Sequence, residues 1–68
     1  MENKKEFNIK FGDIFYTDYF KHRGVVVSIT SKGWHFVLEG GEFRQFINKA
    51  RCHPDELKWE IRNGIKVT

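Results

Sequence analysis

Hydrophobic and polar residues alternate with a period of two along most of this chain, which is the pattern of strands with one buried face. The clearest stretch is residues 24–30, where stiff β-branched side chains that fit a pleated sheet predominate. The alternation places Val25, Val27 and Ile29 on one face and the intervening residues on the other. We therefore predict a strand at residues 24–30.

The segment after this strand predicts a hairpin. Residues 31–33 form a short connection that contains glycine, so the chain should return as an antiparallel partner. Within residues 34–38, Trp34, Phe36 and Leu38 share one face, which predicts a second strand with an aromatic surface. Two consecutive glycines at positions 40 and 41 mark the next turn.

Two further apolar segments precede the strand at residues 24–30. In residues 7–11, three apolar side chains alternate with polar ones, which is the period of a half-buried strand. A Gly-Asp bend at residues 12–13 then precedes a short apolar run at residues 14–16.

Residues 42–52 fit two kinds of element. Four apolar side chains between positions 43 and 50 fall at helical spacing, which indicates a helix. Residues 43–47, however, follow a Gly-Gly turn and are also typical of a strand that continues the sheet. We favour the strand.

The C-terminal part predicts one helical turn and a final strand. Residues 54–57 begin with a proline followed by two acids, which suits the first turn of a helix. Residues 57–61 alternate again as a strand, and the Asn-Gly pair at residues 63–64 is a strong hairpin signal. Residues 65–67 should then pair back onto that strand.

This order of elements resembles the KOW and Tudor-like group of SH3-like barrels over residues 9–61. The features that carry the resemblance are the Gly-Asp bend, the loop to Gly24, the two central strands and the closing turn at residues 54–57. The fold class that follows is mostly β, a small five-stranded SH3-like barrel with one short helical turn before the last strand. Proteins of this group bind RNA, DNA, ribosomes, RNA polymerase or peptides, so the resemblance implies a binding protein.

A second resemblance is to the opening of MazF-type toxin ribonucleases, which have a related barrel core. It is carried by residues 12–16 and 22–29. In that family the arginine is usually followed by proline, whereas Gly24 follows Arg23 here, and the resemblance assigns no second arginine to a catalytic position. We therefore predict a binding module without enzyme activity.

A chain of 68 residues is one domain, and we expect a flexible N-terminus at residues 1–6 and a single small β-barrel domain at residues 7–68. Its seven Phe, two Tyr and two Trp exceed what so small a core needs. Some of these rings should therefore lie at the surface, where they would contact a partner or a second copy in a homodimer.

The composition also limits location and cofactors. No stretch approaches the roughly 18 apolar residues that cross a bilayer, and the first residues lack the apolar run of a signal peptide, so we expect a cytoplasmic protein with no membrane partner. Cys52 is the only cysteine, and zinc sites usually need closely spaced cysteine pairs, so we expect no metal or other cofactor.

The candidate binding residues form two groups. The first is the loop Tyr19, Phe20, Lys21, His22 and Arg23, which combines rings that stack on bases with cations that meet phosphates. In the alternative interpretation, Tyr19 or Phe20 folds back to cap an open end of the barrel.

The second group is Lys32, Trp34 and Arg44. An outward Trp34 would offer a stacking platform flanked by cations, whereas its alternation with Phe36 favours a place in the core.

Two functions fit these observations. The first is binding of nucleic acid, RNA or DNA, or of a nucleoprotein, which the net charge of +3 assists slightly. The second is a protein-protein interaction module that acts as a small regulator or inhibitor, of the kind that phages and mobile elements encode. An even spread of Lys and Arg over the surface would favour the second function over the first.

Overall fold

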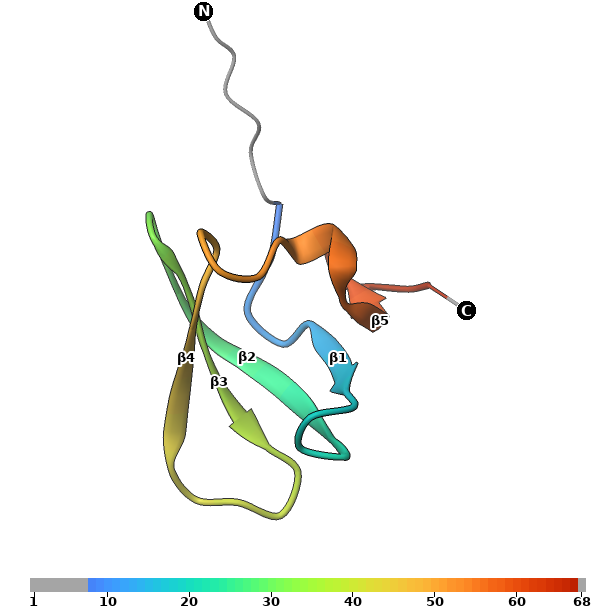
Figure 1. Cartoon of the computed structure of the whole chain (residues 1–68). Coiled ribbons are helices and arrows are strands. Elements are labelled where there is room, and N and C mark those ends of the chain that lie inside the picture. Colours follow the sequence, from blue (N-terminus) through green and yellow to red (C-terminus); the bar gives the residue numbers. More distant parts are fainter. Residues whose placement is uncertain (1–7, 68) are drawn as a thin grey trace, which may run out of the picture.

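The computed structural model describes residues 8–67, which form one antiparallel sheet with the strand order β4-β3-β2-β1-β5-β6 (Figure 1). The strands and the one 3-10 helix are β1 (Ile14–Thr17), β2 (His22–Thr30), β3 (Gly33–Leu38), β4 (Arg44–Asn48), η1 (Pro54–Glu56), β5 (Lys58–Arg62) and β6 (Ile65–Lys66). The mostly β prediction is therefore confirmed, including the helical turn that precedes β5.

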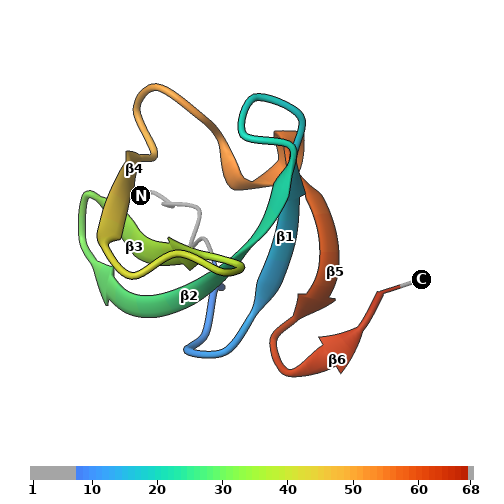
Figure 2. The same ribbon diagram turned by 90° about the horizontal axis from the view of Figure 1, so that it is seen from below.

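Two features of the predicted barrel need correction. The sheet has six strands and not five: the predicted pairing of the chain after the Asn-Gly turn is confirmed at Ile65–Lys66, which form a short strand beside β5. It is also not closed, since β4 and β6 are the two ends of the strand order. In Figure 2 the strongly bent sheet leaves an open side between β4 and β5, spanned by the connection that contains η1.

The core is built around Phe15. The rings of Phe36 and Trp59 both lie 5.2 Å from the Phe15 ring, and the Trp34 ring lies 6.4 Å away, all in edge-on geometry. Gly24 makes this packing possible, because a Cβ there would stand 2.9 Å from the rings of Phe15 and Phe36. Trp34 is fully buried, so the alternation of residues 34–38 identified the inner face correctly.

Residues 42–52 contain a strand rather than a helix, as favoured from the sequence. Residues Arg44–Asn48 pair with β3 along their whole length without a register shift. β2, by contrast, changes register between Val26 and Ser28, and such bulges bend a strand and increase its twist. The register shift in β2 therefore fits the strong curvature of the whole sheet in Figure 2.

The prediction of a strand at residues 7–11 is wrong for residues 8–11. Phe7 lies outside the described residues. Residues 8–10 have no regular structure, and Phe11 is 74% exposed at a turn. The reason is local: the Asp13 N–H donates to the Lys10 carbonyl at 3.0 Å, and Gly12 has a φ of +93°. These residues therefore form a turn in place of a ladder.

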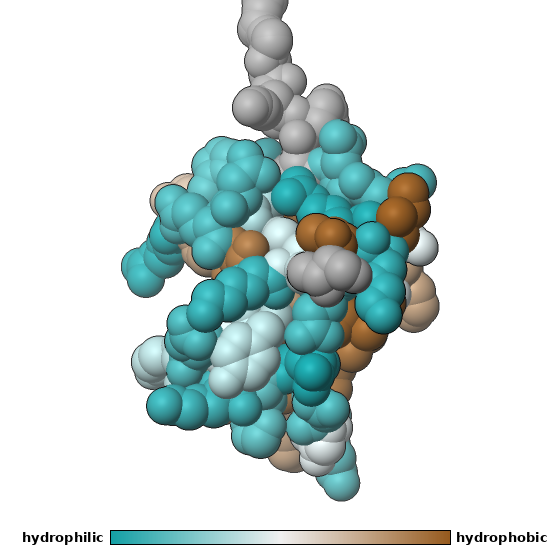
Figure 3. Space-filling model, turned by 90° about the vertical axis from the view of Figure 1, so that its right-hand side faces the viewer, coloured by the Kyte–Doolittle hydropathy of each residue, from teal (hydrophilic) through white to brown (hydrophobic). Residues whose placement is uncertain are grey.

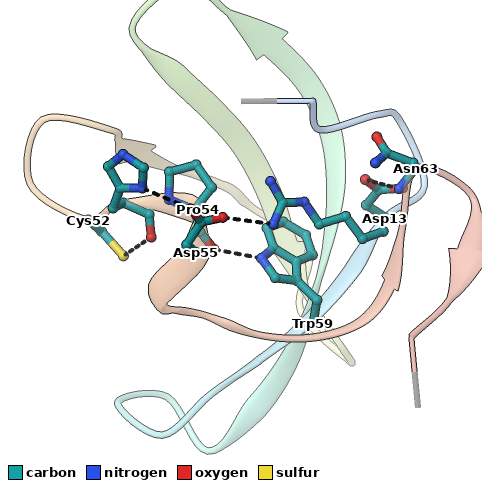
Figure 4. A network of polar contacts seen from close by, with 8 residues as sticks. Asp13, Cys52, Pro54, Asp55, Trp59 and Asn63 are labelled. Carbon is teal, nitrogen blue, oxygen red and sulfur yellow. Dashed lines mark hydrogen bonds and ion pairs between the residues drawn. The ribbon is translucent and has the colours of Figure 1, made fainter. Parts of the chain in front are cut away.

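The turn depends on Asp13, which is fully buried. Its carboxylate accepts hydrogen bonds from the backbone N–H groups of Lys10 and Asn63 at 2.9 Å and of Gly64 at 3.1 Å. Figure 4 shows the Asn63 contact. Three charge-assisted bonds offset the cost of burying the carboxylate, and together they fasten the N-terminal turn to the turn between β5 and β6.

Within residues 8–67, no helix is long and apolar enough to span a bilayer.

We predict that Asp13→Asn lowers the free energy of unfolding by about 2–4 kcal/mol, because an amide presents one oxygen where the carboxylate accepts three N–H groups. Urea denaturation measures this. Asp18→Asn is the matched control and should cost less than about 1 kcal/mol, since the Asp18 carboxylate is exposed in its ion pair with Lys58. Equal losses for the two variants would contradict the role of Asp13.

Candidate binding pocket

The aromatic and basic loop is a tight β-hairpin turn between β1 and β2. The Lys21 N–H donates to the Thr17 carbonyl at 2.7 Å, and the Phe20 N–H donates to Thr17 Oγ1 at 3.1 Å. Lys21 closes the turn in the left-handed region with a φ of 61°. The turn projects Tyr19 into solvent, with 86% of its surface exposed, and directs Phe20 back toward the core.

The two rings of this loop therefore have different positions. Phe20 packs against the core, with its ring 6.1 Å from Phe36, as the capping interpretation proposed. Tyr19 stands edge-on to Phe20 at 4.8 Å and offers its outer side to solvent. Only Tyr19 is free to act as a stacking surface in this loop.

The basic side chains of the loop also differ, in whether they pair with carboxylates. Lys21 and His22 are exposed. Arg23 is held by two carboxylates, since its Nε donates to Glu60 at 2.7 Å and a guanidinium nitrogen lies 3.6 Å from Glu39. The hydrogen bond and the charge of Glu60, and then the charge of Glu39, raise the pKa of Arg23 above its ordinary value.

The second group of predicted residues is not brought together. Trp34 lies in the core and cannot present its ring to a ligand. Lys32 lies in the turn between β2 and β3, whereas Arg44 begins β4 at the opposite end of the β3–β4 pair. Figure 1 shows the two ends of this hairpin well separated. The structure therefore places Arg44, but not Lys32 or Trp34, toward the end of the sheet that carries the Tyr19 loop.

A pocket of about 310 Å³ lies on the open side of the sheet. Its lining comes from the β1–β2 hairpin at residues 16–20, from Ile47 on β4, from Cys52, and from residues 56–58 after η1. In Figure 2 the hairpin turn and the connection after β4 face each other across this side. Two of the predicted site residues, Tyr19 and Phe20, belong to the pocket.

Sequence reasoning missed the other walls of the pocket. Ile47, Cys52 and Leu57 are far from the hairpin in sequence, and only the three-dimensional path of the β4–β5 connection places them beside Phe20. The one sequence feature that indicated this region was the proline and acid pattern of η1, which predicted a helical turn but not the residues that the turn contacts. The position of η1 is set by Trp59, whose indole N–H donates to the Pro54 carbonyl at 2.7 Å (Figure 4).

Charged groups at the pocket are mostly acidic. Asp18 and Glu56 contribute carboxylates, and Lys58 contributes one ammonium, which lies 3.2 Å from Asp18. Lys58 also lies over the Tyr16 ring at 6.0 Å. Two acids and one base leave this lining with a formal charge of −1.

Cys52 lines the pocket and is half-buried there. Partial burial, and secondarily the charge of Glu56, raise the pKa of its thiol. Reactive cysteines have a lowered pKa, because the thiolate is the nucleophile. No cluster of three or more metal-ligating side chains occurs within residues 8–67.

Comparisons with known proteins found no matching family model, curated protein or solved structure.

We predict that alkylation of Cys52 by iodoacetamide has a higher pH midpoint in the folded protein than in the urea-unfolded chain. Glu56→Gln should lower the folded midpoint but keep it above the unfolded one, because burial is the larger cause. Because folding raises the pKa of the Cys52 thiol, this group adds to the free energy of unfolding at pH values below its unfolded pKa. The contribution is lost as pH rises through the folded pKa.

The control for this measurement is Glu42→Gln, an exposed carboxylate outside the pocket lining, which should leave the midpoint unchanged. Identical midpoints for the folded and unfolded chains would show that Cys52 is not buried in a pocket wall.

Proposed function

We propose that this protein is a protein-interaction module that recognises a polypeptide segment by taking one of its apolar side chains into the pocket beside Phe20. The observation that carries this proposal is the combination of an apolar, ring-lined pocket with a net acidic lining. A volume of 310 Å³ is at the lower end of ligand pockets, which span about 300–1,000 Å³, and suits one or two side chains.

The rings at the pocket support a peptide ligand. Tyr16, Tyr19 and Phe20 line one wall, and Tyr side chains combine a large apolar surface with a hydroxyl that can bond to a peptide backbone. Aromatic-lined grooves on small β domains are a recurring means of peptide recognition. Leu57 and Ile47 extend the apolar surface on the other wall.

The charges favour a polypeptide over nucleic acid. Asp18 and Glu56 would repel a phosphate backbone that approached the pocket. Arg23 already pairs with two carboxylates, and Lys58 pairs with Asp18. Lys32 lies in the β2–β3 turn beside Lys49, outside the pocket lining, and Lys66 lies on β6 at the other end of the strand order.

We expect that peptides selected on the immobilised protein from a random peptide phage library share an apolar anchor residue and lose at least about tenfold in affinity when the pocket is blocked. The block is a phenylmaleimide adduct on Cys52, added after folding. The matched control carries the same adduct on Ser31→Cys in a Cys52→Ser background, because Ser31 is exposed in the β2–β3 turn and outside the pocket lining.

Two outcomes would contradict this proposal. One is a library that yields no enriched peptide, or peptides that bind equally well to both adducts. The other is filter retention of single-stranded RNA or DNA at low salt that falls steeply at higher salt, which is the signature of nucleic-acid binding.

A further inference from the structure

β4 is an end strand of the sheet, and half of its backbone groups face away from β3. The Lys49 N–H donates to the Lys32 carbonyl at 2.8 Å, which identifies this position as a hydrogen-bonded pair. Such pairs alternate with non-hydrogen-bonded ones in an antiparallel ladder. Phe46 lies opposite His35, an odd number of residues before Lys49, and is therefore a non-hydrogen-bonded position. Its N–H and C=O groups point away from β3, to the open side.

A second observation agrees with this alternation. The Asn48 carbonyl has the same orientation as that of Phe46, and it accepts the N–H groups of Arg51 and Cys52, at 2.8 and 3.1 Å, on the side away from β3. Arg44, two residues before Phe46, also presents its N–H and C=O to the open side. Within the described chain, no backbone hydrogen bond outside the strand ladders engages Phe46 or Arg44.

This edge lacks most of the devices that protect exposed strands. Natural edges carry proline, bulges or inward charges that prevent another strand from pairing. β4 has the sequence Arg-Gln-Phe-Ile-Asn, pairs with β3 without a bulge, and contains no proline. Arg44 is its one charged residue, and it forms no ion pair with the carboxylates of residues 8–67 that the structure records.

The pocket lies directly beside this edge. Ile47 belongs to β4 and lines the pocket, on the same face as its partner Trp34 in the core. Residues directly opposite each other in a sheet share a face. A strand added to β4 would therefore point the side chain opposite Ile47 toward the pocket.

We infer that the polypeptide partner binds as an extended strand added to β4, with its backbone paired to Phe46 and Arg44 and its apolar anchor opposite Ile47. This inference rests on the proposed function and specifies how the partner is held. Main-chain hydrogen bonds then supply affinity, and the pocket supplies selectivity for the anchor.

The register also specifies a second residue of the partner. Arg44 lies on the outer face, opposite to Ile47, and three positions from it along β4. The partner residue opposite Arg44 therefore lies three positions from the anchor, and an acidic side chain there would pair with the Arg44 guanidinium. The recognised segment is an apolar residue and an Asp or Glu separated by two residues.

The test uses peptides selected from the phage library, with the folded full chain as bait. We expect enrichment of the anchor and acid at this spacing, and Arg44→Glu should remove the preference for the acid. Phe46→Pro removes an N–H that points away from β3, so the ladder with β3 stays intact. Compared with Phe46→Ala, which removes the same ring but keeps the N–H, it should weaken binding by a further tenfold or so.

The outcomes separate this inference from the proposed function. Peptides that are displaced by the Cys52 adduct but bind Phe46→Pro and Phe46→Ala equally would overturn strand addition and leave the pocket proposal standing. If Phe46→Pro does not fold, amide hydrogen exchange of the wild-type complex decides: protection of the Phe46 and Arg44 amides by a selected peptide supports strand addition, and unchanged exchange overturns it. A dimer of the free protein that Phe46→Pro dissociates would overturn the inference, because a second copy would then occupy the edge.

Discussion

The buried carboxylate of Asp13 is the contact that joins the two ends of the described chain. Its oxygens accept the N–H groups of Lys10 on one side and of Asn63 and Gly64, some fifty residues later, on the other. A buried charge is tolerated only when it is fully bonded, so this contact demands one precise arrangement of the two turns. Since β5 ends at Arg62, the same contact holds β5 beside β1, where the Phe15 and Trp59 rings meet edge-on at 5.2 Å.

Fastening the sheet at this place leaves the opposite side open. In Figure 2 the Asp13 turn and the β5–β6 turn lie at the lower margin, while the gap between β4 and β5 lies at the upper one. The chain bridges that gap with residues 49–57 instead of a strand pair, and Phe20 covers the core from the hairpin side. In Figure 3 the side that carries β6 and the C-terminal end is mainly hydrophilic, with apolar residues confined to small areas. The apolar pocket and the unpaired edge of β4 thus belong to one structural feature, the incomplete closure of the sheet.

Local patterns predicted the parts of this fold that depend on neighbouring residues. The β-branched run of residues 24–30, the alternation of Trp34 and Phe36, and the proline and acids of η1 all express preferences of short segments. The prediction of a strand at residues 7–11 was wrong because the Lys10 N–H donates to the Asp13 carboxylate, and the alternation of apolar and polar residues does not reveal this contact. The pocket was predictable only at Tyr19 and Phe20, since its other walls meet the hairpin through long-range folding.

Residue-resolved amide hydrogen exchange on the free protein can compare the stability of the Asp13 contact with that of the β4 edge. If the Asp13 contact holds the fold and the β4 edge is open, the Lys10, Asn63 and Gly64 amides should exchange only with global unfolding, whereas the Phe46 and Arg44 amides should exchange much faster, without unfolding. Fast exchange at the three amides that donate to Asp13, or protection of Phe46 and Arg44 equal to that of the central strands, would contradict it.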